Sequence, residues 1–177
     1  MITEAILRHL QTKAGITLEE RPDKHAEIWE KVKNFFLTAE RRDWFHDRAT
    51  DKRDENAWHY WELYTFGKIQ GYRGEPALQK FDEKKISACY AVRSPSWQTE
   101  KDSPRAVLLK GEYDLSFIKD EYEYELLKND IRGEYPIPAW CLPYLSEHIG
   151  KELYVLDENA DWVLVCTHEN ETFYFER

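Results

Sequence analysis

The sequence predicts an α+β fold in which N-terminal helices pack on a mainly antiparallel sheet ending in a three-stranded C-terminal meander. Apolar side chains recur at helical spacing in residues 2–13 and 22–40, and short alternating segments separated by turn residues fill 151–177. No βαβ repeat is visible in the pattern, which favours antiparallel pairing. A chain of 177 residues with 42% hydrophobic side chains can bury a core, so we expect residues 1–177 to form a single domain.

The two N-terminal helices are indicated by their apolar spacing. Residues 2–13 carry apolar side chains at every fourth position, and Gly15 offers a C-terminal stop. Residues 22–40 open with Pro22, which suits the first turn of a helix, and continue with an aromatic stripe. The stripe residues are Ile2, Ile6 and Leu10 in the first helix and Trp29, Val32, Phe35, Phe36 and Ala39 in the second.

The middle of the chain is less periodic. Residues 41–56 are a run of mixed charge that predicts a solvated loop or a short surface helix. Apolar side chains occupy both sides of residues 57–67, so this segment fits a buried central strand about as well as a helix. The pattern then predicts a short helix over 75–84 and strands over 86–92, 105–110 and 112–117, the last pairing with the strand before it.

Residues 118–131 fit two structures, because their tyrosines alternate like a strand but also share a helical face. The length of the segment without Gly or Pro favours the helix, with Tyr122 as the residue that turns inward. Residues 135–150 begin extended because they contain three prolines, and Pro143 can start a short helix that Gly150 ends.

Aromatic residues make up 15% of the chain, which indicates a core built largely from big rings. The residues expected in the core are Ile6, Leu10, Trp29, Val32, Phe36, Trp61, Val107, Leu109, Leu153, Val155, Val163 and Val165.

The net charge of −9 is unevenly distributed along the chain. Residues 1–111 hold 20 basic and 18 acidic side chains, whereas residues 112–177 hold 5 basic and 16 acidic ones. Such a negative field repels nucleic acid and anionic lipid and attracts a basic protein. We therefore expect a basic protein partner, and neither a nucleic-acid nor a membrane partner.

Three features favour a cytoplasmic protein. No apolar run approaches the length of a membrane span, and the first residues lack the apolar centre of a secretory signal. The three cysteines, Cys89, Cys141 and Cys166, are odd in number and widely spaced among apolar neighbours. This spacing is typical of reduced, buried thiols.

The sequence contains no nucleotide-binding loop, nucleophile elbow or metalloprotease motif. The nearest metal-like group consists of His46, Asp47, Glu55, His59 and Glu62. Cys166 and His168 would share one face of a strand, as a thiol–imidazole pair requires. Both patterns are more typical of packed or solvated side chains, so we assign no catalytic, cofactor-binding or metal residue and expect no cofactor.

The densest mixture of acidic and aromatic side chains lies in residues 111–130. Tyrosine gives a large contact area with one polar group, and surrounding carboxylates steer a basic partner during association. The expected partner-binding residues are Tyr113, Asp114, Asp120, Glu121, Glu123, Tyr124 and Glu125.

These features favour a small acidic protein-binding domain over an enzyme. In surface chemistry the chain is similar to small acidic bacterial immunity proteins that inhibit nuclease toxins, although no motif ties it to a named family. The similarity implies an inhibitor that neutralises a basic partner such as a toxin. Two alternatives stay open: an enzyme with an unrecognised carboxylate and histidine site, and a structural domain.

Overall fold

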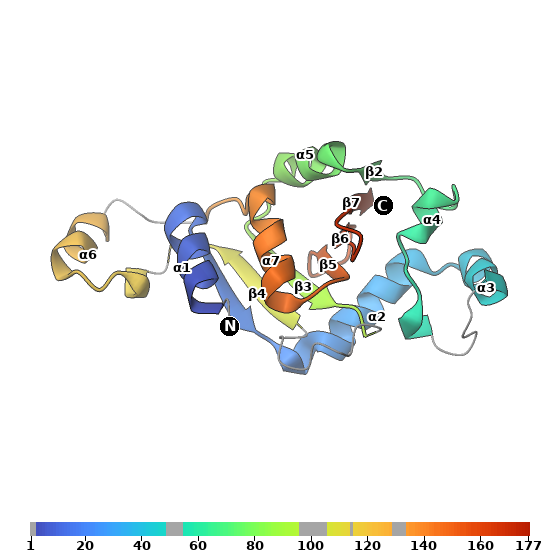
Figure 1. Ribbon diagram of the computed structural model, residues 1–177, viewed down its shortest axis with the longest axis horizontal. Helices are drawn as coiled ribbons and strands as arrows, with labels where there is room; N and C mark the ends of the chain where they lie inside the picture. The colour runs from blue at the N-terminus through green and yellow to red at the C-terminus, as the bar shows by residue number, and fades with distance from the viewer. Residues whose placement is uncertain (1–2, 49–54, 96–105, 114, 129–133) are drawn as a thin grey trace.

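The computed structural model describes residues 3–48, 55–95, 106–113, 115–128 and 134–177 (Figure 1). Its fold is α+β, as predicted, with a sheet of 7 strands in the order β1-β4-β3-β5-β6-β7-β2. All neighbouring strands in this sheet pair antiparallel. The strands are β1 (Ile16–Glu20), β2 (Tyr72–Arg73), β3 (Ala88–Arg93), β4 (Ala106–Gly111), β5 (Leu153–Leu156), β6 (Trp162–Cys166) and β7 (Thr172–Glu176).

Helices connect and cover these strands. The α-helices are α1 (Thr3–Ala14), α2 (His25–Phe36), α3 (Ala39–Arg48), α4 (Glu62–Thr65), α5 (Glu75–Glu83), α6 (Glu121–Leu127) and α7 (Leu142–Ile149). Short 3-10 helices are η1 (Pro22–Lys24), η2 (Glu55–Ala57), η3 (Leu115–Phe117) and η4 (Ala139–Cys141). In the part of the chain that the structure describes, no helix is long and apolar enough to cross a membrane.

The sheet separates two hydrophobic clusters. Side chains of α1, α5 and α7 pack on one face, and side chains of α2, α3 and α4 pack on the other. Successive strand residues therefore alternate between the clusters: Leu153 and Val155 of β5 belong to the first, and Tyr154 and Leu156 to the second. All the residues expected in the core are buried. The two N-terminal helices, α1 and α2, lie on opposite faces of the sheet.

Most of the predicted elements are confirmed. The C-terminal meander forms as β5, β6 and β7, in which Leu153 pairs with Cys166 and Trp162 pairs with Glu176. The charged run 41–56 contributes most of α3, where Phe45 is buried. Residues 118–131 contain the helix α6, whereas 57–67 form no strand and contain only the short helix α4.

One predicted strand is wrong, and two strands, β1 and β2, were missed. The described residues of the segment 112–117 do not pair with β4, since Leu115–Phe117 form a 3-10 helix. β4 lies between β3 and β1, and β1 is a five-residue strand whose Ile16 pairs with Gly111 and whose Leu18 pairs with Leu109. This pairing joins segments that are far apart in the sequence, and a local apolar pattern cannot choose between a near and a distant partner.

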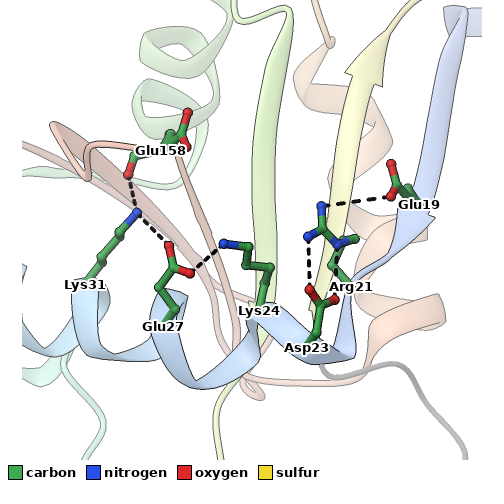
Figure 2. Close-up of polar contacts among 7 residues, drawn as sticks. All are labelled: Glu19, Arg21, Asp23, Lys24, Glu27, Lys31 and Glu158. Atoms are coloured by element: carbon green, nitrogen blue, oxygen red, sulfur yellow. Dashed lines mark hydrogen bonds and ion pairs between the residues drawn. The ribbon is translucent and has the colours of Figure 1, made fainter.

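Charged side chains line the passage from β1 into α2 (Figure 2). Arg21 Nη2 donates to Asp23 Oδ2 at 3.0 Å, and Arg21 Nη1 lies 3.9 Å from Glu19 Oε1. Lys31 Nζ donates to the carbonyl oxygen of Glu158 at 2.8 Å, which links α2 to the turn before β6. Exposed pairs of this kind contribute little to stability, so we ascribe the placement of α2 mainly to its buried aromatic face.

His148 on α7 predicts a pH-dependent contribution to stability. The side chain is buried, burial lowers the pKa of its imidazole, and its Nδ1 has no hydrogen-bond partner among the described residues. A histidine whose pKa is lowered by folding stabilises the native state fully above its unfolded value of about 6.5, and this contribution is lost as the pH falls below it. Replacing His148 with leucine is therefore expected to make stability fall less steeply from about pH 7 to about pH 5.

Urea unfolding of the wild type and of His148→Leu across this pH range checks the prediction. The pKa of His59 is raised instead, mainly by its hydrogen bond with Glu152, so its contribution has the opposite sign. That contribution is present below about pH 6.5, is lost as the pH rises through the folded pKa, and is common to both proteins. Parallel stability curves for the two proteins would contradict the assignment to His148.

Candidate functional site

The predicted interaction surface is placed on α6 and the segment before it. Asp120 caps the helix, because its Oδ1 accepts a 2.8 Å bond from the backbone N–H of Glu123. Tyr113 is half-buried, and its ring packs against the backbone of Gly15. The remaining described members, Glu121, Glu123, Tyr124 and Glu125, are exposed on α6, and Asp114 lies outside the described residues.

α6 has no buried residue among its seven. Tyr122 is 75% exposed and Leu126 is 55% exposed, and their i, i+4 spacing places both on one side of the helix. The prediction that Tyr122 turns inward is therefore wrong. The helix forms through its cap and local charge pairs, such as that between Glu125 and Lys128, rather than by burying an apolar face.

The excursion that carries α6 is held at its base. The chain leaves the sheet at Gly111 and comes back beside it at Tyr135, whose N–H donates to the carbonyl oxygen of Gly111 at 2.5 Å. The rings of Tyr113 and Tyr135 meet edge to face with centroids 5.2 Å apart. Figure 1 shows α6 at one end of the molecule beyond α1, with α3 and α4 at the opposite end. α6 therefore lies away from the sheet, on a segment that these contacts fix at its base.

A second group of polar side chains surrounds Glu152, between α7 and β5. Helix α7 ends at Ile149 and is followed by its C-cap Gly150, whose φ is 114°, and Glu152 has a φ of 57°. This backbone conformation is unusual for a residue with a side chain, and it directs the Glu152 side chain into the protein, where it is 0% exposed. The backbone is held there by a 3.0 Å bond from the Ser94 N–H to the Glu152 carbonyl oxygen.

Each carboxylate oxygen of Glu152 has two polar contacts. Oε1 accepts a 2.7 Å bond from Trp61 Nε1 and lies 3.0 Å from His59 Nδ1. Oε2 accepts a 2.9 Å bond from the His168 backbone N–H and lies 2.7 Å from His168 Nδ1. The two imidazole rings, 29% and 27% exposed, have centroids 5.1 Å apart. We call His59, Glu152 and His168 the His–Glu–His centre.

The electrostatics of the His–Glu–His centre follow from these contacts. Burial by itself raises the pKa of Glu152, but the hydrogen bonds from His59 and His168 outweigh it and hold the pKa below the ordinary value. The hydrogen bond with Glu152 raises the pKa of the His59 imidazole. Burial raises the pKa of Glu62, which also acts on His59 through its charge. The centre therefore favours positive charge beside a buried carboxylate.

The residues that the sequence suggested as metal ligands or as a thiol–imidazole pair have other contacts in the structure. The five residues of the metal-like group do not form one cluster, since Glu55 pairs with Arg42 while His59 contacts Glu152. Burial raises the pKa of the Cys166 thiol to about 11, so it is protonated at neutral pH, as is typical of a structural cysteine. His168 lies beyond the end of β6, beside Glu152.

A cavity of about 490 Å³ lies between α5, α7 and the turn that joins β6 to β7. Its lining combines apolar side chains such as Leu78 and Leu142 with polar ones such as Lys151 and Glu171. Lys151 precedes Glu152 in the chain, but none of the three residues of the His–Glu–His centre lines this cavity. The cavity and the centre are thus separate features.

Comparison of the chain with protein-family models, with curated proteins and with solved structures finds no match.

Proposed function

We propose that this protein binds a basic protein partner through α6. The observation that carries the proposal is a helix without buried residues that exposes Tyr122 and Leu126 among carboxylates. Exposed apolar side chains grouped within a polar surround are typical of interaction surfaces. A helix of seven residues also gains little stability by itself, so packing against a partner would stabilise it.

The negative charge on and next to α6 favours one class of partner. Asp120, Glu121, Glu123 and Glu125 stand on or next to the helix, against Lys119 and Lys128. This excess of negative charge accelerates association with a positively charged surface and opposes association with nucleic acid. Tyr122 supplies a large, stiff side chain of the type that often dominates binding energy at the centre of an interface.

The specific form of the proposal is an inhibitor that neutralises a basic toxin. Enzymes that act on nucleic acid carry basic surfaces, because they must contact phosphates. An acidic helix bearing tyrosine could cover such a surface and exclude the substrate. A basic toxin-like protein encoded beside this chain is the partner to test.

The test is a binding measurement between the full chain and that basic protein at two salt concentrations. We expect a complex that weakens as salt rises, because exposed charges contribute to it. Reversing Glu121, Glu123 and Glu125 to lysine is expected to weaken binding by at least about tenfold, and Tyr122→Ala by a similar factor.

A matched control keeps the same change in net charge. Reversal of the exposed Glu40, Glu75 and Glu158 to lysine is expected to leave affinity within about threefold of the wild type. Equal losses in the two triple variants would show that net charge alone drives the association. An unchanged affinity in the α6 variants would place the interface elsewhere.

A further inference from the structure

We propose that His59, Glu152 and His168 form a binding site for a divalent transition-metal ion of the zinc class. Each residue offers one ligand atom, and these atoms lie within 4.8 Å of one another. Two imidazoles and one carboxylate are a ligand set that zinc takes in proteins, and three protein ligands leave a fourth position for water. The site uses no residue of α6 and is independent of the proposed partner binding.

The carboxylate is held by donors that a bound metal would not displace. Trp61 Nε1 fixes Oε1 at 2.7 Å, and the His168 backbone N–H fixes Oε2 at 2.9 Å. Ligating carboxylates are typically oriented by such outer hydrogen bonds, which improve metal affinity by about 10–100-fold. These two hydrogen bonds therefore orient the Glu152 side chain independently of the two imidazoles.

The imidazoles are close to the positions that coordination requires. Their Nδ1 atoms lie 3.0 Å and 2.7 Å from the Glu152 oxygens. Zinc at about 2.0–2.2 Å from each ligand atom holds neighbouring ligand atoms about 3.3 Å apart in a tetrahedral site. The widest separation among the three ligand atoms, within 4.8 Å, has to shorten by up to about 1.5 Å to reach this value, and the partial exposure of both rings permits such a movement.

The charge around the site favours a cation. Glu152 is completely buried, and the ion pairs of the described residues give it only histidine partners and no lysine or arginine. Glu62 and Glu169 add further negative charge that acts on His59. A buried carboxylate needs compensating positive charge, and a divalent ion supplies it.

The backbone at Glu152 agrees with a functional role. A φ of 57° lies in the left-handed region, which a residue with a side chain rarely adopts. Strained positions of this kind are often found at ligand-binding sites. Here the strain falls on the residue that supplies the buried carboxylate.

The test uses the full chain after treatment with a chelator. Titration with Zn²⁺ is expected to show one ion bound per chain with a Kd of about 1 μM or tighter. In the wild type, NMR signals of the His59 and His168 imidazoles should shift on adding Zn²⁺, whereas those of the exposed His46 should not. This comparison needs no variant, so it stands even if substitutions at Glu152 prevent folding.

Variants then assign the ligands. His59→Ala and His168→Ala are each expected to weaken Zn²⁺ binding by at least about a hundredfold, and Trp61→Phe by about tenfold, while His46→Ala binds as the wild type does. Absence of Zn²⁺ binding by the wild type would overturn the proposal and leave a hydrogen-bonded structural network. Undiminished binding by folded His59→Ala and His168→Ala would also overturn it and point to the thiols.

Discussion

Replacing Glu152 with alanine is expected to lower the free energy of unfolding by about 3–5 kcal/mol, as for other broken buried pairs. The substitution removes an acceptor that four contacts share and leaves the Trp61 indole N–H and the His168 backbone N–H without it. Each buried donor left unsatisfied costs about 1–3 kcal/mol. Urea unfolding in the presence of a chelator measures this loss without any contribution from bound metal.

A second substitution at the same position separates the loss of the carboxylate from the effect of backbone strain. Because the φ of Glu152 is 57°, glycine fits its backbone better than alanine, so Glu152→Gly is expected to be about 1 kcal/mol more stable than Glu152→Ala. The two variants lack the same carboxylate, and the difference between them reports the backbone strain. Glu158→Ala, at an exposed position, is expected to change stability by less than about 0.5 kcal/mol. A loss below about 1 kcal/mol in Glu152→Ala would show that the buried network does not form.

The elements that could be predicted from the sequence are those whose pattern is local. The C-terminal meander alternates over three short segments, and the aromatic stripe of α2 repeats at helical spacing, so each is specified by neighbouring residues. β1 is as short as the meander strands, but it was missed because no neighbouring segment pairs with it and its partner β4 lies far along the chain. Residues 57–67 could not be assigned from the sequence, because apolar side chains on both sides fit a buried strand as well as a helix. In the structure these side chains are buried around a turn and α4, not in a strand.

The His–Glu–His centre could not be predicted for the same physical reason. His59 and Glu152 are separated by 93 positions, and only the pairing of β5 with β6 brings Glu152 close to His168. No spacing motif marks three residues that meet through tertiary structure. The acidic tract was found because its signal is compositional, although the sequence alone could not show that Tyr122 points outward.

Replacing Gly111 with alanine is expected to lower the free energy of unfolding by about 3 kcal/mol, at the upper end for overpacked sites. A Cβ at this position would overlap the carbonyl oxygen of Tyr135. The obstacle is backbone, which cannot rotate away as a side chain can. The segment is also fixed on both sides, by the Tyr135 bond to Gly111 and by the Ile137 N–H bond to the Ile86 carbonyl oxygen at 2.6 Å.

Gly67→Ala is the matched control for this steric effect. Gly67 has a φ of 69°, and no atom lies within 4 Å of the position that a Cβ would take, so alanine there adds strain of about 1 kcal/mol without a collision. Equal losses at Gly67 and Gly111 would contradict the close approach of Tyr135. Urea unfolding of the two variants provides the comparison.

Gly111→Ala also tests which contacts support α6. Gly111 precedes α6 in the chain and Tyr135 follows it, so the contact between them forms the base of the excursion. Gly111→Ala is expected to speed amide hydrogen exchange at Tyr135 and Ile137 more than in β6, which is an interior strand of the sheet. A loosened base would also weaken the proposed binding of a partner without altering any side chain of α6, because the helix would have to be ordered again on binding. Unchanged exchange at Tyr135 would mean that the excursion is supported elsewhere.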